Sequence, residues 1–528
     1  MNPRWSVVLL TFAPGCAVPT TTTDTVPSGD YAEADADSDS DSDADSDADV
    51  DTTLPPENED ALSLLPPAQT DRYVFVANPD RDTVTRIAVD TLDVDTTPVG
   101  ADPEIVLTTP DFQHAVVFSR GDATVTTIDA NTLEKHTVDV RDNLNQMVMS
   151  PDGAWVVLFH DVRLDALDDT GHEPDGLQSF NEASFVEVAT AAHSPMAVGF
   201  NPKMVRFTPD ARTAVVVSDA YLAKIELRRE VLAPELFELA PGELDAPSAE
   251  EVIVSADGSF AWVRQFGATE LLVVDLETGA VTPVPAGDNP TDLDLSPDGA
   301  EAVAVARASA ELWVYDAARP FDAARVVGLP SGGSYGSLLF DPTGDQAVLY
   351  TTATPVERFA VWDRASDTVT ERSLVKPVAS MAITPTGGSV LVFHTRTDGP
   401  DTEPVFAGQP AITLVDLDDF RSNPMLLPED PIGFANAESG LRGYFAMKNT
   451  LFLEVLDYVT LLNDQLPLFS VPAFVGVLPD LAPADGDEPA AWVSQDHPLG
   501  RISFYDPDDG SLETLTGFEL NGGIDEDP

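Results

Sequence analysis

The sequence predicts an all-β fold, a single β-propeller whose blades are four-stranded antiparallel sheets. The first observation is a repeated unit, clearest at residues 288–316. There an alternating stretch (291–295), a turn (296–299), a small apolar run (302–306) and a second alternating stretch (311–315) follow one another. The second observation is that about ten such units recur at spacings of about 41 to 58 residues, close to the period of one blade. Because one blade cannot bury both of its faces, we expect a closed ring of roughly seven to ten blades.

The first 16 residues have the pattern of an exported leader. Arg4 supplies a positive charge, and residues 5–13 form an apolar run, too short for a membrane span of about 20 residues. Cys16, the only cysteine, follows the small residues that end this run. The site resembles the lipobox of bacterial lipoproteins, in which this cysteine is acylated, so we expect residues 1–16 to be a signal peptide with lipidation at Cys16. The alternative is a plain secretory leader with an incidental cysteine. With one cysteine, no internal disulfide can form.

Residues 17–69 are rich in Thr, Asp and Ser, and Asp occupies every second position from 35 to 51. Large apolar residues are almost absent before Leu54, and the like charges repel one another. We expect an extended, disordered acidic tether. The alternative is calcium binding, but calcium loops need a glycine to bring carboxylates together, and residues 35–51 contain none.

The whole chain is strongly acidic, with a formal net charge of −64 from 27 basic and 91 acidic residues. Residues 24–60 hold only 15 of these acids, so most of the negative charge belongs to the propeller. Affinity for phosphate backbones and for anionic lipid surfaces comes from Lys and Arg. The composition therefore argues against a nucleic-acid partner, and we expect membrane contact through the lipid anchor only.

The first repeats have a more specific pattern. In order they carry Tyr73-Val74-Phe75-Val76-Ala77-Asn78, residues 83–89, Val99-Gly100, Asp102-Pro103 and Pro110-Asp111. Equivalent turns follow at Ser150-Pro151-Asp152-Gly153, Thr208-Pro209-Asp210, Ser255-Ala256-Asp257-Gly258, Ser296-Pro297-Asp298-Gly299, Asp341-Pro342-Thr343-Gly344 and Thr384-Pro385-Thr386-Gly387. This order resembles the YVTN family of β-propeller repeats, which is related to WD40-like propellers. Some YVTN-like propellers are lactonases and others are electron-transfer or cofactor-binding modules, so the resemblance implies these activities as possibilities.

We assign residues 70–520 to the propeller and residues 521–528 to an acidic tail. The first unit lacks an obvious inner strand, and the turn signal decays after Pro431. Strands from both termini are expected to share a blade, because such closure removes exposed sheet edges.

Two units are lengthened between their second and third strands, at residues 159–184 and 393–408. The resemblance implies that both insertions open on the end of the ring that carries the connections between blades. Their donors could bind a divalent cation such as calcium; the alternative is an ordinary polar loop, because the spacing fits no defined motif. The candidates are His160, Asp161, Asp165, Asp168, Asp169, His172, Glu173 and Asp175 in the first insertion, and His394, Asp398, Asp401 and Glu403 in the second.

The sequence contains no HExxH, phosphate-binding loop or CxxC motif for catalysis. The tryptophans in or beside strand patterns are expected to pack between blades rather than to bind sugars. They are Trp155, Trp262, Trp313, Trp362 and Trp492.

We therefore expect a non-catalytic, lipid-anchored propeller that binds a protein or surface ligand at the cell surface or facing the periplasm. The insertions should form the functional face and contribute little to the fold. The alternative is a propeller hydrolase, lactonase-like or metal-assisted, with its site on the central face. No cofactor is firmly implied by the sequence, although a divalent cation such as calcium is possible.

Overall fold

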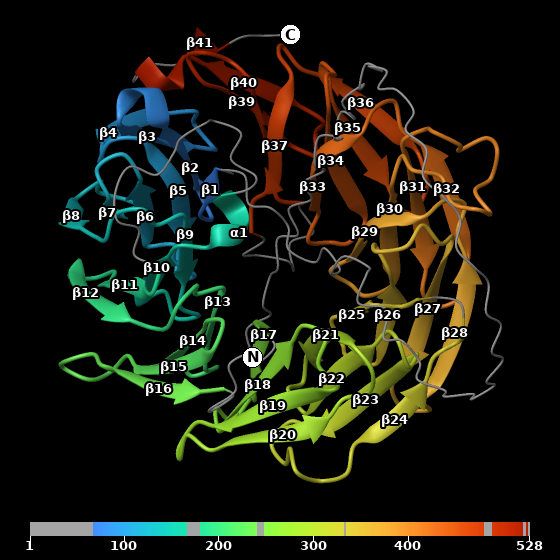
Figure 1. The fold of residues 1–528 in the computed structure, drawn as a ribbon. Helices are drawn as coiled ribbons and strands as arrows, with labels where there is room; N and C mark the ends of the chain where they lie inside the picture. The colour runs from blue at the N-terminus through green and yellow to red at the C-terminus, as the bar shows by residue number, and fades with distance from the viewer. Residues whose placement is uncertain are drawn as a thin grey trace, which may run out of the picture.

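The computed structural model describes residues 67–165, 180–239, 248–331, 334–479, 488–520 and 524–525. These residues form ten antiparallel sheets, nine with four strands and one with five, which follow one another around a ring (Figure 1). The predicted propeller is confirmed, and its blade number is ten. The predictions for the leader, for Cys16 and for the tether up to residue 66 lie outside the described residues.

Each blade consists of strands that are consecutive in sequence, and we number the blades in chain order. The first strand of each blade lies nearest the axis (Figure 1): β1 (Ala68–Gln69), β5 (Pro103–Thr108), β9 (Gln146–Met149), β13 (Met204–Phe207), β17 (Ala249–Val254), β21 (Pro290–Leu295), β25 (Ser337–Phe340), β29 (Val378–Ile383), β33 (Pro431–Asn436) and β37 (Pro472–Val477). The second strands are β2 (Tyr73–Asn78), β6 (His114–Ser119), β10 (Trp155–Phe159), β14 (Thr213–Val217), β18 (Phe260–Gln265), β22 (Glu301–Ala306), β26 (Gln346–Tyr350), β30 (Ser389–His394), β34 (Arg442–Met447) and β38 (Ala491–Gln495).

The third strands are β3 (Thr83–Ala88), β7 (Thr124–Asp129), β11 (Glu182–Glu187), β15 (Tyr221–Glu226), β19 (Glu270–Asp275), β23 (Glu311–Asp316), β27 (Arg358–Asp363), β31 (Ala411–Asp416), β35 (Phe452–Asp457) and β39 (Arg501–Tyr505). The fourth, outer strands are β4 (Val94–Pro98), β8 (Lys135–Asp139), β12 (Ala192–Ala197), β16 (Pro234–Glu238), β20 (Val281–Pro285), β24 (Arg325–Gly328), β28 (Thr368–Ser373), β32 (Ser422–Leu426), β36 (Asn463–Pro467) and β40 (Leu512–Thr516).

Among the residues that the structure describes, few outside these strands form regular structure. Blade 10 has a fifth strand, β41 (Ile524–Asp525), within the predicted acidic tail. The helical segments are η1 (Pro79–Arg81), α1 (Val162–Asp165) and η2 (Phe518–Leu520). Among the described residues, no helix is long and apolar enough to cross a membrane.

The turns between first and second strands explain the repeated Ser/Thr-Pro-Asp-Gly signal. In blade 6 the Ser296 hydroxyl donates to Asp298 at 2.6 Å and accepts the Glu301 amide at 2.9 Å, and Gly299 adopts φ +70°. The same Ser/Thr-to-Asp bond occurs in blades 2 to 5, from Thr109, Ser150, Thr208 and Ser255. Side chains therefore form hydrogen bonds with backbone amides where the chain reverses direction in these hairpins, which fixes the register of each one.

The core consists of ten main hydrophobic clusters among the described residues, one between each pair of neighbouring blades. Second strands are covered on both faces: all residues of β22 from Ala302 to Ala306 are buried, with Val303 only 1 % exposed. Outer strands are much more exposed, as Val326 on β24 shows at 44 %. The tryptophans pack in these clusters as predicted, with Trp262 and Trp362 fully buried.

Blades 1 and 10 close the ring through side chains, not through a blade shared by both termini as expected. Ala68 and Gln69, which the sequence placed in the tether, form the missing inner strand of blade 1. The Gln69 amide donates to the Val477 carbonyl of blade 10 and accepts the indole N–H of Trp492. Arg81 pairs with Glu519 at 3.0 Å near the rim. An apolar cluster that includes Trp492 fills the space between the two blades.

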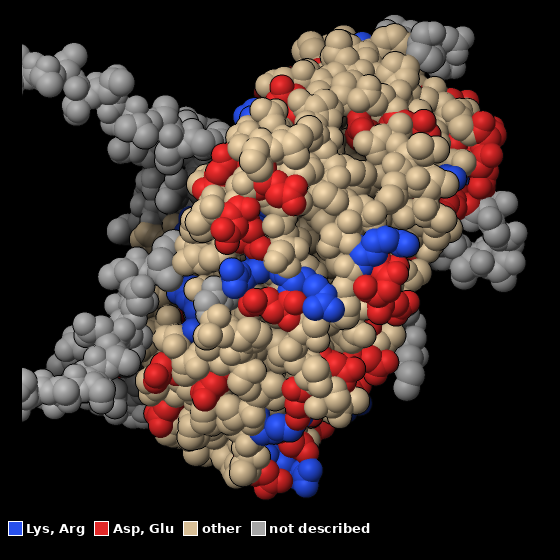
Figure 2. Space-filling view, turned by 90° about the vertical axis from the view of Figure 1, so that its right-hand side faces the viewer, with Lys and Arg blue, Asp and Glu red and all other residues tan. Residues whose placement is uncertain are grey.

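Basic residues lie among acidic ones on the surface. Figure 2 shows one side of the ring, where Lys and Arg side chains gather near the middle, bordered by Asp and Glu. Arg364 pairs with Glu301 at 2.6 Å, and Arg325 pairs with the same carboxylate at 2.7 Å. The Arg364 pair joins blades 6 and 7, whereas the Arg325 pair lies within blade 6.

Candidate functional site

The two insertions lie on the end of the ring that carries the connections between blades, as predicted. The first, between β10 and β11, places Arg163 within 2.9 Å of the Lys203 carbonyl in the connection to blade 4. The second, between β30 and β31, places the Phe406 carbonyl 2.9 Å from Lys376 in the connection to blade 8. The insertions belong to blades 3 and 8, which lie on opposite sides of the ten-blade ring (Figure 1). They therefore form two separate sites.

His160 and His394 occupy equivalent places at the inner ends of these insertions. His160 Nδ1 lies 2.6 Å from the Asn143 carbonyl, and His394 Nδ1 lies 3.2 Å from the Pro377 carbonyl, each 17 residues earlier in the chain. His394 Nε2 also lies 2.7 Å from the Thr413 hydroxyl, so it accepts that proton while Nδ1–H donates. Burial lowers the His394 pKa to about 4, which keeps the ring neutral. Both ring nitrogens of His394 thus hold blade 8 together.

Two of the described aspartates among the candidate metal ligands, Asp161 and Asp398, are also engaged in the fold. Asp161 binds the Arg163 guanidinium through both oxygens, the shortest contact being 2.7 Å. Asp398 Oδ1 accepts the Gly408 amide at 2.9 Å and pairs with Lys376 at 3.1 Å. The backbone amides of Asp401 and Glu403 donate to the Glu357 carboxylate and the Val375 carbonyl. Asp165 ends α1, and the other five candidates, Asp168, Asp169, His172, Glu173 and Asp175, lie outside the described residues. In the described parts of the chain, no three metal-binding side chains converge.

The second insertion is tightly integrated into the ring. Lys376, fully buried beneath it, donates to the carbonyls of Phe406 at 2.9 Å and Gln409 at 3.0 Å. Glu357 of blade 7, only 5 % exposed, accepts the Thr402 hydroxyl at 2.8 Å. The Phe406 side chain is buried with Val375 and Ala411. The expectation that both insertions contribute little to the fold is therefore wrong for this one, because its polar sequence conceals two buried charged contacts.

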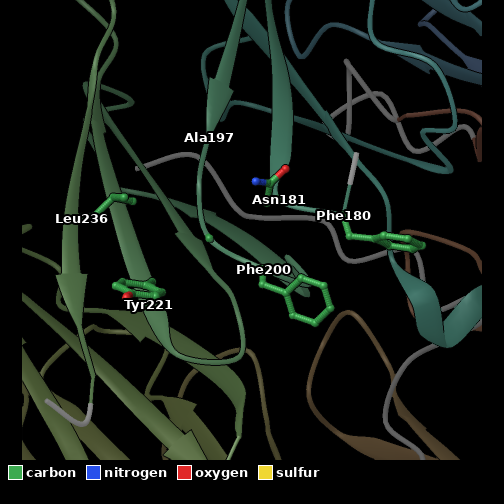
Figure 3. A pocket seen from close by; sticks show the side chains of 7 residues that line it. Phe180, Asn181, Ala197, Phe200, Tyr221 and Leu236 are labelled. Carbon is green, nitrogen blue, oxygen red and sulfur yellow. The ribbon is translucent and has the colours of Figure 1, made fainter. Parts of the chain in front are cut away.

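An apolar pocket opens between blades 3 and 4 at the base of the first insertion, with a volume of about 440 Å³. Phe180 and Asn181 immediately precede β11, and Gly199 and Phe200 lie in the connection to β13. The rest of the lining comes from Ala197 at the end of β12, Tyr221 at the start of β15 and Leu236 on β16. Figure 3 shows Tyr221 and Leu236 on the blade 4 side and the two phenylalanines on the other.

The backbone holds Phe200 in place while the residue remains 61 % exposed. The Phe200 carbonyl accepts the Asp219 amide at 3.1 Å, and the next amide, of Asn201, donates to the Phe180 carbonyl at 2.6 Å. Gly199 has φ +111°, and a Cβ there would lie 2.1 Å from the Ser218 hydroxyl. Only glycine allows this close approach. The Phe180 and Phe200 rings lie with centroids 6.3 Å apart.

A second site combines charges near the axis. Glu251 on β17 pairs with Arg264 on β18 at 2.9 Å, and both side chains are almost buried. Burial and the Glu251 charge raise the pKa of Asp294 on β21 to about 7, against the opposing effect of Arg206 on β13. Three neighbouring inner strands thus place a carboxyl group that titrates near neutrality beside the axis.

The sequence did not single out either site. The only signals were an aromatic residue after a glycine in a connection, at Phe200, and acids within the expected inner strands, at Glu251 and Asp294.

Comparison with known proteins identifies no family. Neither a protein-family model nor a curated protein matches the sequence. Among solved structures, the dihydro-heme d1 dehydrogenase NirN in complex with DHE is 15 % identical with a TM-score of 0.40, covering 70 % of this chain and 77 % of that one. The β-propeller domain of Cps50 (Swd1) from Myceliophteria thermophila is 11 % identical with a TM-score of 0.35, covering 61 % and 96 %.

The C-terminal WD40 domain of Sif2 is 10 % identical with a TM-score of 0.40, covering 64 % of this chain and 90 % of that one. At these scores the likenesses carry no argument about function. The resemblance of the repeats to the YVTN family stays a resemblance.

Proposed function

We propose that the protein is an exported, lipid-anchored propeller that binds a protein or surface ligand on the insertion-bearing end of its ring. The supporting observation is the apolar pocket at the base of the first insertion. Exposing aromatic surface to water is unfavourable in free energy, and this cost is removed when a partner covers the surface. Phe200 is exposed although its backbone is fixed on both sides, a combination typical of binding anchors.

The proposed binding role is tested with the immobilised propeller and an extract of cell-surface proteins. Phe200→Ala and Leu236→Ala remove two walls of the pocket, and Phe266→Ala is the matched control, because Phe266 is also exposed, follows β18 and does not line the pocket. A partner detected by quantitative mass spectrometry should be lost with the first two variants and kept with the control. If all variants retain the same proteins, the binding site lies elsewhere.

The proposed anchor rests on the leader and on Cys16. Cys16→Ser should move the protein from the membrane fraction to the soluble exported fraction, measured by fractionation and immunoblotting. A wild-type protein that is already soluble after export would refute the anchor and leave the binding role intact.

One observation favours the alternative hydrolase on the central face, namely Asp294, whose pKa of about 7 suits a general base. Hydrolysis of a lactone panel by wild type and Asp294→Asn tests it. Activity that rises through pH 7 and is lost in the variant would support a hydrolase, and equal background rates would reject it.

A further inference from the structure

We propose that the pocket between blades 3 and 4 takes an apolar side chain carried by a basic segment of a partner protein. This inference rests on the proposed binding function and specifies the chemistry of the partner. It follows from the shape and lining of the pocket, from its rigidity and from the charges at its rim.

The lining favours an anchor side chain. Phe180, Ala197, Phe200 and Leu236 supply the apolar surface, and the volume of about 440 Å³ is near the lower end of the range of about 300–1,000 Å³ for ligand sites. Such a pocket has room for one large aliphatic or aromatic side chain, but not for a folded domain. Most of the surrounding partner surface must therefore lie outside it.

The pocket is built before any ligand arrives. Its walls come from strands of two blades that share one buried cluster, which includes Phe185, Val216 and Ala223. The connection between them is fixed by Gly199 and by the backbone hydrogen bonds on either side of Phe200. Little conformational entropy is lost when such a site is filled, which favours recognition of a single anchor.

The polar groups at the edge suit an extended peptide. The Asn181 amide and the Tyr221 hydroxyl border the pocket, and within the described part of the chain neither is hydrogen-bonded to another residue. Both groups can donate and accept hydrogen bonds, as backbone amides and carbonyls require. They would hold the backbone on either side of the anchor.

The acidic residues at the rim of the pocket favour a partner segment of positive charge. Glu238 pairs in register with Tyr221 and is exposed, and strand alternation places its side chain on the same face of β16 as Leu236. Asp219, directly beside Phe200 through a backbone bond, keeps its side chain 32 % exposed although it pairs with Lys203. With a net charge of −64, the protein attracts basic segments and repels acidic ones.

The test uses three synthetic peptides of equal length and the purified propeller, with affinity measured by calorimetry. The first has one leucine flanked by lysines, the second replaces the leucine by alanine, and the third replaces the lysines by glutamates. We expect the first to bind at least about tenfold more tightly than either of the others, because each loses either the buried apolar side chain or the charge complementarity.

Variants locate the binding. Phe200→Ala and Leu236→Ala should weaken the first peptide by about tenfold or more. Glu238→Gln should weaken it several-fold at low salt, and this effect should disappear at high salt. Phe266→Ala and Glu270→Gln, exposed positions of blade 5 outside the pocket, should leave affinity unchanged.

The outcomes separate the two proposals. If a surface protein is captured in a Phe200-dependent way but the lysine and glutamate peptides bind equally, the basic-partner inference is wrong and the binding function stands. If free indole binds in a Phe200-dependent way and no peptide does, the pocket serves a small aromatic ligand and the inference is overturned. If neither capture nor peptide binding depends on Phe200, both proposals fail.

Discussion

Replacing Asp294 by Asn should make the stability of the ring less dependent on pH. Burial, with the neighbouring Glu251 charge, raises the pKa of this carboxyl from its ordinary value of 3.8 to about 7. Between these two values the folded protein holds a proton that the unfolded chain has released. The stability contributed by Asp294 is therefore fully present below about pH 4 and is lost as the pH rises to 7. Asn has no such titration.

The magnitude follows from the shift. Between pH 5 and pH 8 the unfolded carboxyl stays ionised while the folded one loses its proton, a change equivalent to about two pKa units or about 3 kcal/mol. The free energy of unfolding of Asp294→Asn, relative to wild type, should therefore rise by up to about 3 kcal/mol from pH 5 to pH 8. Comparing the same two proteins at both pH values cancels any contact that Asn itself gains or loses.

The assay is urea unfolding followed by tryptophan fluorescence at both pH values. Asp288→Asn, an exposed position in the same repeat, is the matched control and should show no change with pH beyond that of wild type. Glu251→Gln should reduce the pH dependence of wild type, because it removes one cause of the raised pKa. A difference between Asp294→Asn and wild type that is the same at pH 5 and pH 8 would refute the reasoning.

Three further predictions concern the fold. Val303→Asp buries a charge at a strand position that is 1 % exposed, and should lower the free energy of unfolding by about 3–5 kcal/mol in chemical denaturation. Val326→Asp, at a position that is 44 % exposed, should change it little. Equal losses would contradict the assignment of the core. Lys376→Met leaves the carbonyls of Phe406 and Gln409 without their donor, and should make residues 395–410 sensitive to limited proteolysis. Lys448→Met, at an exposed position, is the control. A loop that stays resistant would show that Lys376 does not anchor it. Trp492→Phe removes the hydrogen bond to Gln69 between blades 1 and 10, and should lower the free energy of unfolding by about 1–3 kcal/mol more than Trp262→Phe does. The reason is that the buried indole N–H of Trp262 has no partner among the described residues. Equal losses would mean that the Trp492 bond does not stabilise the closure.

Features encoded by neighbouring residues were predictable from the sequence. The turn at Ser296 to Gly299 depends on bonds that span five residues or fewer, so its composition alone indicates a hairpin. Strand periodicity also survives where the turn signal is lost. In blade 9 the turn signal is replaced at residues 436–440, yet β33 and β34 still pair, and for this reason the repeat number matches the blade number.

Features that depend on distant residues were not predictable. The two residues of β1 are too few to show a period, and their partners Val477 and Trp492 lie at the other end of the chain. Histidine is a common metal ligand, but the Nδ1 atoms of His160 and His394 instead bond backbone carbonyls 17 residues earlier in the chain, which the sequence alone does not reveal. The pocket around Phe200 is assembled from several strands and a connection, none of which is unusual alone.

The way in which the ring closes also determines where mechanical tension would act. β1 pairs only Ala68 and Gln69 with β2, and its other bonds run to blade 10 and to the neighbouring Thr108 hydroxyl at 2.6 Å. If Cys16 anchors the chain as proposed, a pull on the propeller reaches these few bonds before any full-length strand. The ring would then begin to yield at one defined seam, where the bonds of Gln69 are loaded before the apolar cluster between blades 1 and 10.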